Sequence, residues 1–215
     1  EKYGEHLVDR GGLVVKTTLD MDKQGFAEEV IESRVEANKG FEASNASLVS
    51  LDTKTGEILA MVGSVDYFND EIDGQVNVAL RPRQPGSSFK PIVYTLAWER
   101  GYIPSTIVFD VNTDFPGTGK IYQPKNYDLK ERGPVSLRTA LQGSLNIPAV
   151  KMLYLLGVGN VLDFADELGY TTFADRSRFG LSLVLGGGEV TLLDHTAAYA
   201  TLATEGVYHQ PMALL

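Results

Sequence analysis

Two apolar runs near the start of the chain most constrain its fold. Residues 46–51 (ASLVSL) and 57–63 (EILAMVG) have strand-like composition, and they flank a turn-forming segment, residues 52–56 (DTKTG), in which Gly56 can supply the positive φ that a hairpin needs. An isolated two-stranded hairpin is marginally stable in water, and these runs are too apolar to be left solvated. We therefore expect the hairpin to belong to a larger antiparallel sheet.

The segments around the hairpin predict mainly helices. A β-branched run, residues 13–20, predicts a short strand after Gly11 and Gly12. The spacing of apolar residues predicts one helix over residues 20–40 and a second that begins within residues 84–91 and ends near residue 101. It also predicts several helices between residues 136 and 205. Between residue 101 and Pro134 a loop-rich segment is expected. The predicted fold class is α+β, with the strands early and the helices late in the chain.

Composition excludes several classes of protein. The 215 residues, 43% of them hydrophobic, are enough for one sizeable core. A net charge of −9 without a clustered basic stripe argues against a nucleic-acid binder. The absence of cysteine excludes disulfides, thiolate nucleophiles and Cys-ligated zinc. Because no apolar stretch approaches the ~18 residues needed to span a bilayer, we expect any membrane anchor to lie outside this chain.

The segment QPGSSFKP, residues 84–91, places two serines and a lysine at the start of a predicted helix. Residues three apart on a helix share a face, with Cβ atoms roughly 5–6 Å apart, so Ser87 and Lys90 can enter one site that Ser88 cannot join. A lysine whose pKa is lowered by burial can take the proton of a serine hydroxyl. The spacing thus predicts Ser87 as a nucleophile and Lys90 as its base, and the alternative is a helix cap beside a solvated lysine.

A second polar pair, Ser144 and Asn146, lies between two helical runs, just before Pro148. Residues i and i+2 of an extended segment project to the same side, so a hydroxyl and a carboxamide would be offered together. The hydroxyl could relay a proton, and the carboxamide could orient a substrate amide or the lysine. A polar turn at a helix end would look the same. The joint occurrence with Ser87 and Lys90 is what favours a catalytic site, because Ser-x-x-Lys, Ser-Asp-Asn and Lys-Thr-Gly together mark class A β-lactamases and penicillin-binding proteins.

Four segments resemble, in order, the transpeptidase domain of class A, bifunctional penicillin-binding proteins: residues 48–64, 83–91, 143–151 and 189–206. Residues 11–20 also resemble the lead-in from the glycosyltransferase domain, so the resemblance covers nearly the whole chain. It implies the α+β fold shared by penicillin-binding proteins and serine β-lactamases, an antiparallel sheet with a helical subdomain. It also implies a peptidoglycan DD-transpeptidase that β-lactams acylate, with Ser87 as nucleophile, Lys90 as base, and Ser144 and Asn146 as the second motif. No metal or organic cofactor is implied.

The third motif is expected outside the chain. Lys54-Thr55-Gly56 spells the triplet, but it precedes the nucleophile and lies in the predicted hairpin turn, so we interpret it as unrelated to the site. The resemblance implies that the functional triplet, its strand and half of the oxyanion hole follow Leu215, whereas the backbone N–H of Ser87 supplies the other half. We therefore expect a chain truncated before the C-terminal Lys-Thr-Gly strand, as a fragment or a cleaved piece that does not fold alone.

The resemblance also predicts domains, partners and location. Residues 1–19 are expected to be a lead-in strand or interdomain linker, and residues 20–215 the N-terminal and helical part of the transpeptidase domain. The expected partners are stem peptides ending in D-Ala-D-Ala, β-lactams, the missing C-terminal part of the domain and an upstream glycosyltransferase domain, but no nucleic acid. The expected location is extracytoplasmic, in the periplasm or on the outer face of the membrane, with the anchor in a segment not in this chain.

Two rival functions share the Ser87 and Lys90 pair. A serine β-lactamase or DD-carboxypeptidase would use water as the acceptor, and a β-lactam sensor would be acylated once and signal without being an enzyme. Leu145, in the place of the aspartate of Ser-Asp-Asn, fits transpeptidases better than class A β-lactamases.

Two other patterns predict no site. Asp110, Asn112 and Asp114 have calcium-loop spacing but lack the required glycine and the final glutamate. The three histidines, His6, His195 and His209, are not grouped with serines or metal ligands, so neither a Ser-His-Asp triad nor a zinc site is expected.

Overall fold

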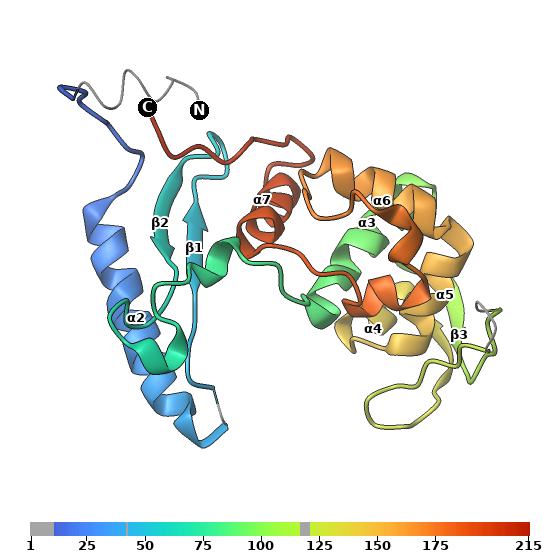
Figure 1. Ribbon diagram of the computed structural model, residues 1–215. Helices are drawn as coiled ribbons and strands as arrows, with labels where there is room; N and C mark the ends of the chain where they lie inside the picture. Colours follow the sequence, from blue (N-terminus) through green and yellow to red (C-terminus); the bar gives the residue numbers. More distant parts are fainter. Residues whose placement is uncertain (1–10, 42, 117–120) are drawn as a thin grey trace. The chain divides into compact units, whose positions relative to one another are not determined.

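The computed structural model describes residues 11–41, 43–116 and 121–215 (Figure 1). They form two compact units, one containing the residues up to Ala79 together with His209–Leu215, and the other containing Leu80–Tyr208. These units are defined by contacts within the chain and do not decide the predicted division at residues 19 and 20. Residues 1–10 of the predicted lead-in lie outside the described residues, and the lead-in itself stays a prediction.

In the first unit, helix α2 (Met21–Asn38) packs against the hairpin through Ala27, Ile31 and Val35. It begins where the sequence predicts, because the carboxylate of Asp20 accepts hydrogen bonds from the first free N–H groups of the helix. A short 3₁₀ turn, Lys39–Phe41, follows its end. The predicted helix over residues 20–40 is therefore confirmed.

The predicted hairpin is also confirmed. Strands β1 (Leu48–Leu51) and β2 (Ile58–Val62) pair antiparallel. Asp52 closes the turn by accepting the N–H groups of residues 54 and 55 on its carboxylate. Gly56 has φ of 79°, and a Cβ there would lie 2.4 Å from the carbonyl oxygen of Gln210. Only glycine fits this position, because the turn needs a left-handed residue and the chain passes directly over it.

The predicted strand over residues 13–20 is reduced to a single bridge. Thr17 pairs antiparallel with Leu214, and the backbone N–H of Thr18 donates to Ala213. The same C-terminal segment also pairs with the hairpin, through a parallel bridge between Glu57 and Met212. Backbone bonds from residues 212–215 thus reach both residues 16–18 and residues 56–58.

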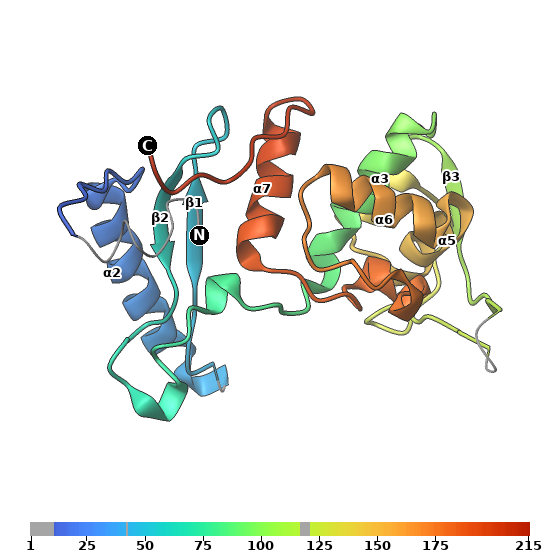
Figure 2. The same ribbon diagram turned by 45° about the horizontal axis from the view of Figure 1, so that its top comes forward.

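The second unit is mainly helical, with helix α3 packed on α5 and α6 around one apolar core (Figures 1 and 2). The helices are α3 (Lys90–Glu99), α4 (Leu137–Gln142), α5 (Asn146–Leu156), α6 (Val158–Glu167) and α7 (Leu192–Ala203). Short 3₁₀ turns lie at Gly86–Phe89, Arg176–Arg178 and Leu181–Leu185. Among the described residues no single helix is long and apolar enough to cross a bilayer. Helices α5 and α6 taken together have the length and apolar composition of a membrane span, but the two helices are bent by 89° relative to each other.

A second hairpin corrects the prediction of a loop up to Pro134. Strands β3 (Ile107–Asp110) and β4 (Gly133–Ser136) pair antiparallel within the second unit. Only Val108 and Asp110 of β3 are buried, and β4 begins with Gly and Pro. Such residues are typical of turns, which is why the sequence indicated a loop.

Candidate active site

Ser87 lies on a 3₁₀ turn, Gly86–Phe89, that runs directly into α3. Its side chain is exposed, and its carbonyl oxygen accepts the backbone N–H of Lys90. In a 3₁₀ turn the side chains at i and i+3 eclipse, which places Ser87 and Lys90 on the same side of the chain. Gly86 supplies the left-handed residue, with φ of 59°, that starts the turn.

Lys90 is buried among hydrogen-bond acceptors and is not solvated. Only 1% of the residue is exposed. Its Nζ lies 2.5 Å from the carbonyl oxygen of Ser144, 3.0 Å from Ser144 Oγ and 2.7 Å from Asn146 Oδ1. The alternative of a helix cap beside a solvated lysine is therefore wrong for Lys90. Burial lowers the pKa of Lys90 to about 8, which brings the neutral amine within reach near neutral pH.

The structure brings Ser144 and Asn146 together on Lys90, as their spacing predicts. Ser144 takes a left-handed conformation, with φ of 49°, between the end of α4 and the start of α5. A hydroxyl can both accept and donate, so Ser144 Oγ can accept from the ammonium group or donate to the neutral amine. The contact can therefore persist in both protonation states, as a proton relay requires.

His195 lies against a serine, which corrects the expectation that the histidines stand apart from any serine. Its Nε2 is 2.9 Å from Ser88 Oγ, and its Nδ1 is 2.6 Å from Tyr170 Oη. Ser88 Oγ donates to the carbonyl oxygen of Pro85 at 2.6 Å, so it must accept from the Nε2–H of His195. Nδ1 is then free to accept the Tyr170 hydroxyl. His6 lies outside the described residues.

This direction of hydrogen bonding makes His195 a donor to Ser88, not a base for it. Burial lowers the pKa of His195 and so favours the neutral imidazole that the arrangement needs. One helical turn further along α7, the Tyr199 hydroxyl donates to the carbonyl oxygen of Ser88 at 2.8 Å. The hydroxyl and the carbonyl oxygen of Ser88 thus both help to hold the turn that presents Ser87.

A glycine loop also supports this turn. Gly186 has φ of 84°, and a Cβ there would lie 2.2 Å from the backbone nitrogen of Gly86. The glycine run at residues 186–188 therefore includes a residue packed directly on the residue before Ser87. The glycine run is visible in the sequence, but the contact of Gly186 with Gly86 is not.

The triplet Lys54-Thr55-Gly56 forms the turn between β1 and β2, as its interpretation as a hairpin predicts. Lys54 is exposed and belongs to the first unit, whereas the four predicted site residues belong to the second.

We expect Lys54→Ala to leave penicillin acylation unchanged in the intact protein, because the side chain is exposed and the bond of this residue to Asp52 comes from its backbone N–H. The measurement is the rate of covalent labelling by a fluorescent penicillin, with Lys90→Ala as the comparison. Equal losses in the two variants would show that the triplet takes part in the site.

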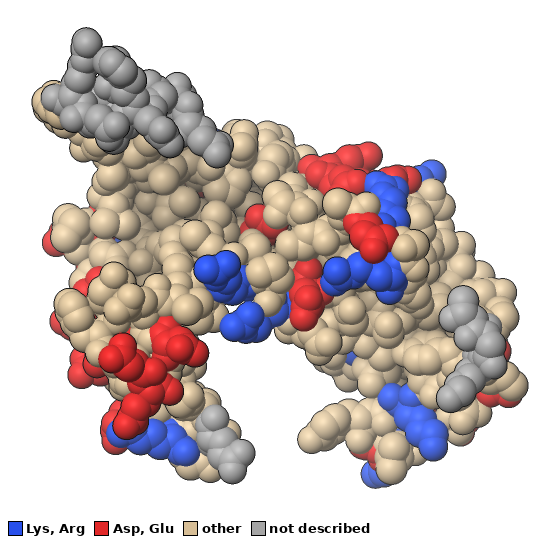
Figure 3. Space-filling view, viewed as in Figure 1, with Lys and Arg blue, Asp and Glu red and all other residues tan. Residues whose placement is uncertain are grey.

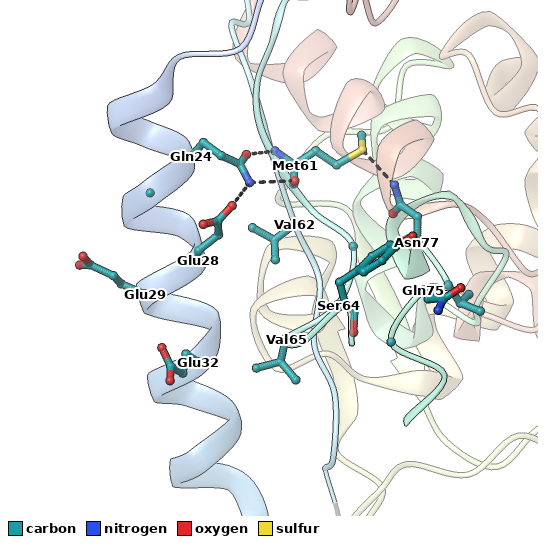
Figure 4. A pocket seen from close by; sticks show the side chains of 15 residues that line it. Gln24, Glu28, Glu29, Glu32, Met61, Val62, Ser64, Val65, Gln75 and Asn77 are labelled. Carbon is teal, nitrogen blue, oxygen red and sulfur yellow. Dashed lines mark hydrogen bonds between the residues drawn. The ribbon is translucent and has the colours of Figure 1, made fainter. Parts of the chain in front are cut away.

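A pocket of about 720 Å³ lies in the first unit, between α2 and the segment that follows β2 (Figure 4). The carboxamide of Gln24 bridges to the backbone of Met61 and to Glu28 at its wall. None of the four predicted site residues lines it. The acidic side chains that line this pocket do not by themselves indicate a ligand.

Comparison with known proteins identifies the family. The family model "Penicillin binding protein transpeptidase domain" matches residues 46–214, which is most of the chain. The chain therefore belongs to the penicillin-binding protein transpeptidase family and has its α+β fold.

Individual relatives are penicillin-binding proteins 1A. That of Neisseria gonorrhoeae is 37% identical over 96% of this chain and 24% of its own length. That of Aquifex aeolicus is 39% identical over 77% of this chain and 22% of its own length. The chain thus spans about a quarter of the length of the curated relatives that it matches.

Solved structures agree with this assignment. PonA1 of Mycobacterium tuberculosis, whose structure has also been solved in complex with penicillin V, matches 98% of this chain and 55% of its own with a TM-score of 0.80 at 25% identity. Penicillin-binding protein 1A of Haemophilus influenzae matches 79% of this chain and 25% of its own with a TM-score of 0.71 at 31% identity.

Proposed function

We propose that the chain carries the nucleophile and the base of a serine-type peptidoglycan DD-transpeptidase. The observation that carries the proposal is the buried amine of Lys90, held by Ser144 and Asn146 and one 3₁₀ turn from exposed Ser87. A lysine depends on such burial to act as a base near neutral pH.

The proposed reaction has two steps. Neutral Lys90 takes the proton of Ser87 while Oγ attacks the penultimate D-Ala carbonyl carbon of a stem peptide. An ester forms, the D-Ala–D-Ala amide bond breaks, and the proton passes through Ser144 to the leaving D-alanine amine. An amine of a second stem peptide then attacks the ester, its proton returns to Ser87, and a new amide bond links the two peptides.

β-Lactams would acylate the same serine, and the solved complex of the relative PonA1 with penicillin V supports this part of the proposal. The backbone N–H of Ser87 is one donor for the developing oxyanion. We propose that the second donor and the functional Lys-Thr-Gly strand come from the C-terminal part of the same domain.

The wider setting is also a proposal, supported by the similarity to penicillin-binding proteins 1A. It comprises an upstream glycosyltransferase domain, a membrane anchor and an extracytoplasmic location. Figure 3 shows acidic and basic side chains intermingled on the face in view, without a continuous basic patch over its described residues. That distribution is consistent with a peptide substrate rather than a nucleic acid.

The rival functions differ in the fate of the acyl-enzyme. Leu145 is 5% exposed and packs in the core, so an aspartate at this position would carry a buried charge. The site therefore fits a transpeptidase better than the Ser-Asp-Asn motif of class A β-lactamases. Incubation of the intact protein with a labelled penicillin separates the rivals: a persistent adduct supports the transpeptidase, whereas rapid release of penicilloate indicates a β-lactamase. A donor stem peptide, with and without an acceptor amine, distinguishes cross-linking from carboxypeptidase or sensor behaviour.

The lowered pKa of Lys90 predicts the pH dependence of acylation. The base is active when neutral, so the rate should rise with pH and reach half its plateau near the pKa of about 8. About a tenth of the lysine is neutral at pH 7 and about nine-tenths at pH 9, so the rate constant should rise roughly tenfold between them. Stopped-flow labelling of the intact protein measures this profile. A rate that falls as pH rises would contradict a neutral lysine base.

A further inference from the structure

Helix α5, which carries Asn146 at its start, is not capped by its own flanking residue. The N-cap residue, Leu145, makes no side-chain cap bond, and Pro148 in the first turn has no N–H. Instead, Asn126 Oδ1 accepts the backbone N–H groups of Asn146 at 2.8 Å and Ile147 at 3.3 Å. The cap therefore comes from a residue 20 positions earlier in the chain.

Asn126 is itself held in one orientation. It is 4% exposed, and its Nδ2 donates to both carboxylate oxygens of Asp110, at 2.8 and 3.0 Å, and to the carbonyl oxygen of Lys130 at 2.8 Å. A flipped carboxamide would place its oxygen against the carboxylate and its N–H₂ against the helix donors. Asp110 is fully buried, and Arg132 compensates its charge through a backbone N–H at 3.2 Å and its guanidinium at 3.6 Å.

The neighbouring peptide fixes the side chain of Asn146. Asn146 Nδ2 donates to the carbonyl oxygen of Lys125 at 2.9 Å, which leaves Oδ1 to face the amine of Lys90. Residues 125 and 126 thus set both the backbone position and the carboxamide orientation of Asn146. No hydrogen bond joins Asn126 or Asp110 to Ser87 or Lys90.

We propose that Asn126, oriented by Asp110, is a positioning residue for the acylation site: it caps α5 and so holds the acceptor that places Lys90 beside Ser87. This proposal rests on the function proposed above. It assigns a role to residues 125 and 126, which lie in none of the three motifs.

The first test is Asn126→Ala in the intact protein. Loss of the cap should let Asn146 shift, and a misplacement of about 1 Å at a catalytic group can slow a reaction about a hundredfold. We expect labelling by fluorescent penicillin to slow about tenfold to a hundredfold. Ser136→Ala is the matched control, because it removes the cap of the adjacent helix α4 in the same unit without contacting Asn146. Equal slowing in the two variants at equal thermal stability would overturn the proposal.

Exchanging the two side chains provides a conservative rescue. Asn126→Asp keeps an acceptor for the helix N–H groups but places a second carboxylate against Asp110, so it should acylate slowly. Adding Asp110→Asn restores one carboxamide and one carboxylate, and the double variant should acylate several-fold faster than Asn126→Asp alone. No recovery in a double variant that folds would count against the proposed pair. This comparison also keeps the proposal testable if Asn126→Ala does not fold.

A third measurement does not depend on penicillin. Acetic anhydride modifies neutral amines, and the modification of Lys90 relative to exposed Lys54 can be followed by peptide mass spectrometry. Asn126→Ala should increase the relative modification of Lys90, whereas Ser136→Ala should not. Unchanged modification in Asn126→Ala would overturn the positioning role even if the protein proves not to be acylated, an outcome that would separately contradict the proposed function.

Discussion

Ser87→Ala should abolish covalent labelling of the intact protein by penicillin. The substitution removes the only oxygen that can form the proposed ester at this position, and the turn around it is held by other contacts. These contacts are the close packing of Gly186 on Gly86 and the bonds of Ser88 to Pro85, His195 and Tyr199. We therefore expect a folded protein without an adduct, detected by gel fluorescence and by intact mass.

Ser88→Ala is the matched control for this prediction. It removes a neighbouring hydroxyl that donates to Pro85 and accepts from His195, so labelling should be slower but should still reach completion. Labelling that persists in Ser87→Ala and is lost in Ser88→Ala would identify Ser88 and His195 as the reacting pair instead.

Lys90→Ala should lower the rate constant of acylation by about 10²- to 10⁴-fold, the range that a general base typically contributes. Lys90 is almost fully buried, so alanine would also leave a cavity and three unpaired acceptors. Lys90→Met keeps most of the volume without the amine and should show the same loss of rate. The measurement is stopped-flow labelling by fluorescent penicillin.

Arg100→Met is the control for loss of a cation in the same unit. Arg100 follows the end of α3, its side chain is exposed, and its bonds to Leu96 and Trp98 come from its backbone N–H. We expect labelling within a few-fold of the unaltered protein. If Lys90→Met acylates as fast as Arg100→Met, the lysine is not the base.

The sequence predicts the parts of the fold that depend on neighbouring residues. The hairpin follows from two apolar runs and Gly56, and α2 follows from Asp20 and the spacing of its apolar residues. The hairpin of β3 and β4 was missed because its strands are short and β4 begins with Gly and Pro. Pairing between segments so far apart in the chain carries no local signal.

The candidate site likewise combines features that the local sequence predicts with contacts that only the tertiary fold reveals. The spacing of Ser87 with Lys90, and of Ser144 with Asn146, is local and visible in the sequence. The contact of Ser88 with His195 joins residues 107 positions apart, and Asn126 caps a helix 20 positions later. Such supporting contacts depend on the tertiary fold, so sequence spacing predicts the groups that react but not the groups that hold them in place.

Locating the penicillin adduct tests the central claim most directly. The intact protein is incubated with a labelled penicillin, digested, and the modified peptide is sequenced by mass spectrometry. We predict one adduct, carried by Ser87, in the peptide that contains residues 83–91. An adduct on Ser88 or on any other residue, or no adduct on a folded protein, would contradict the account.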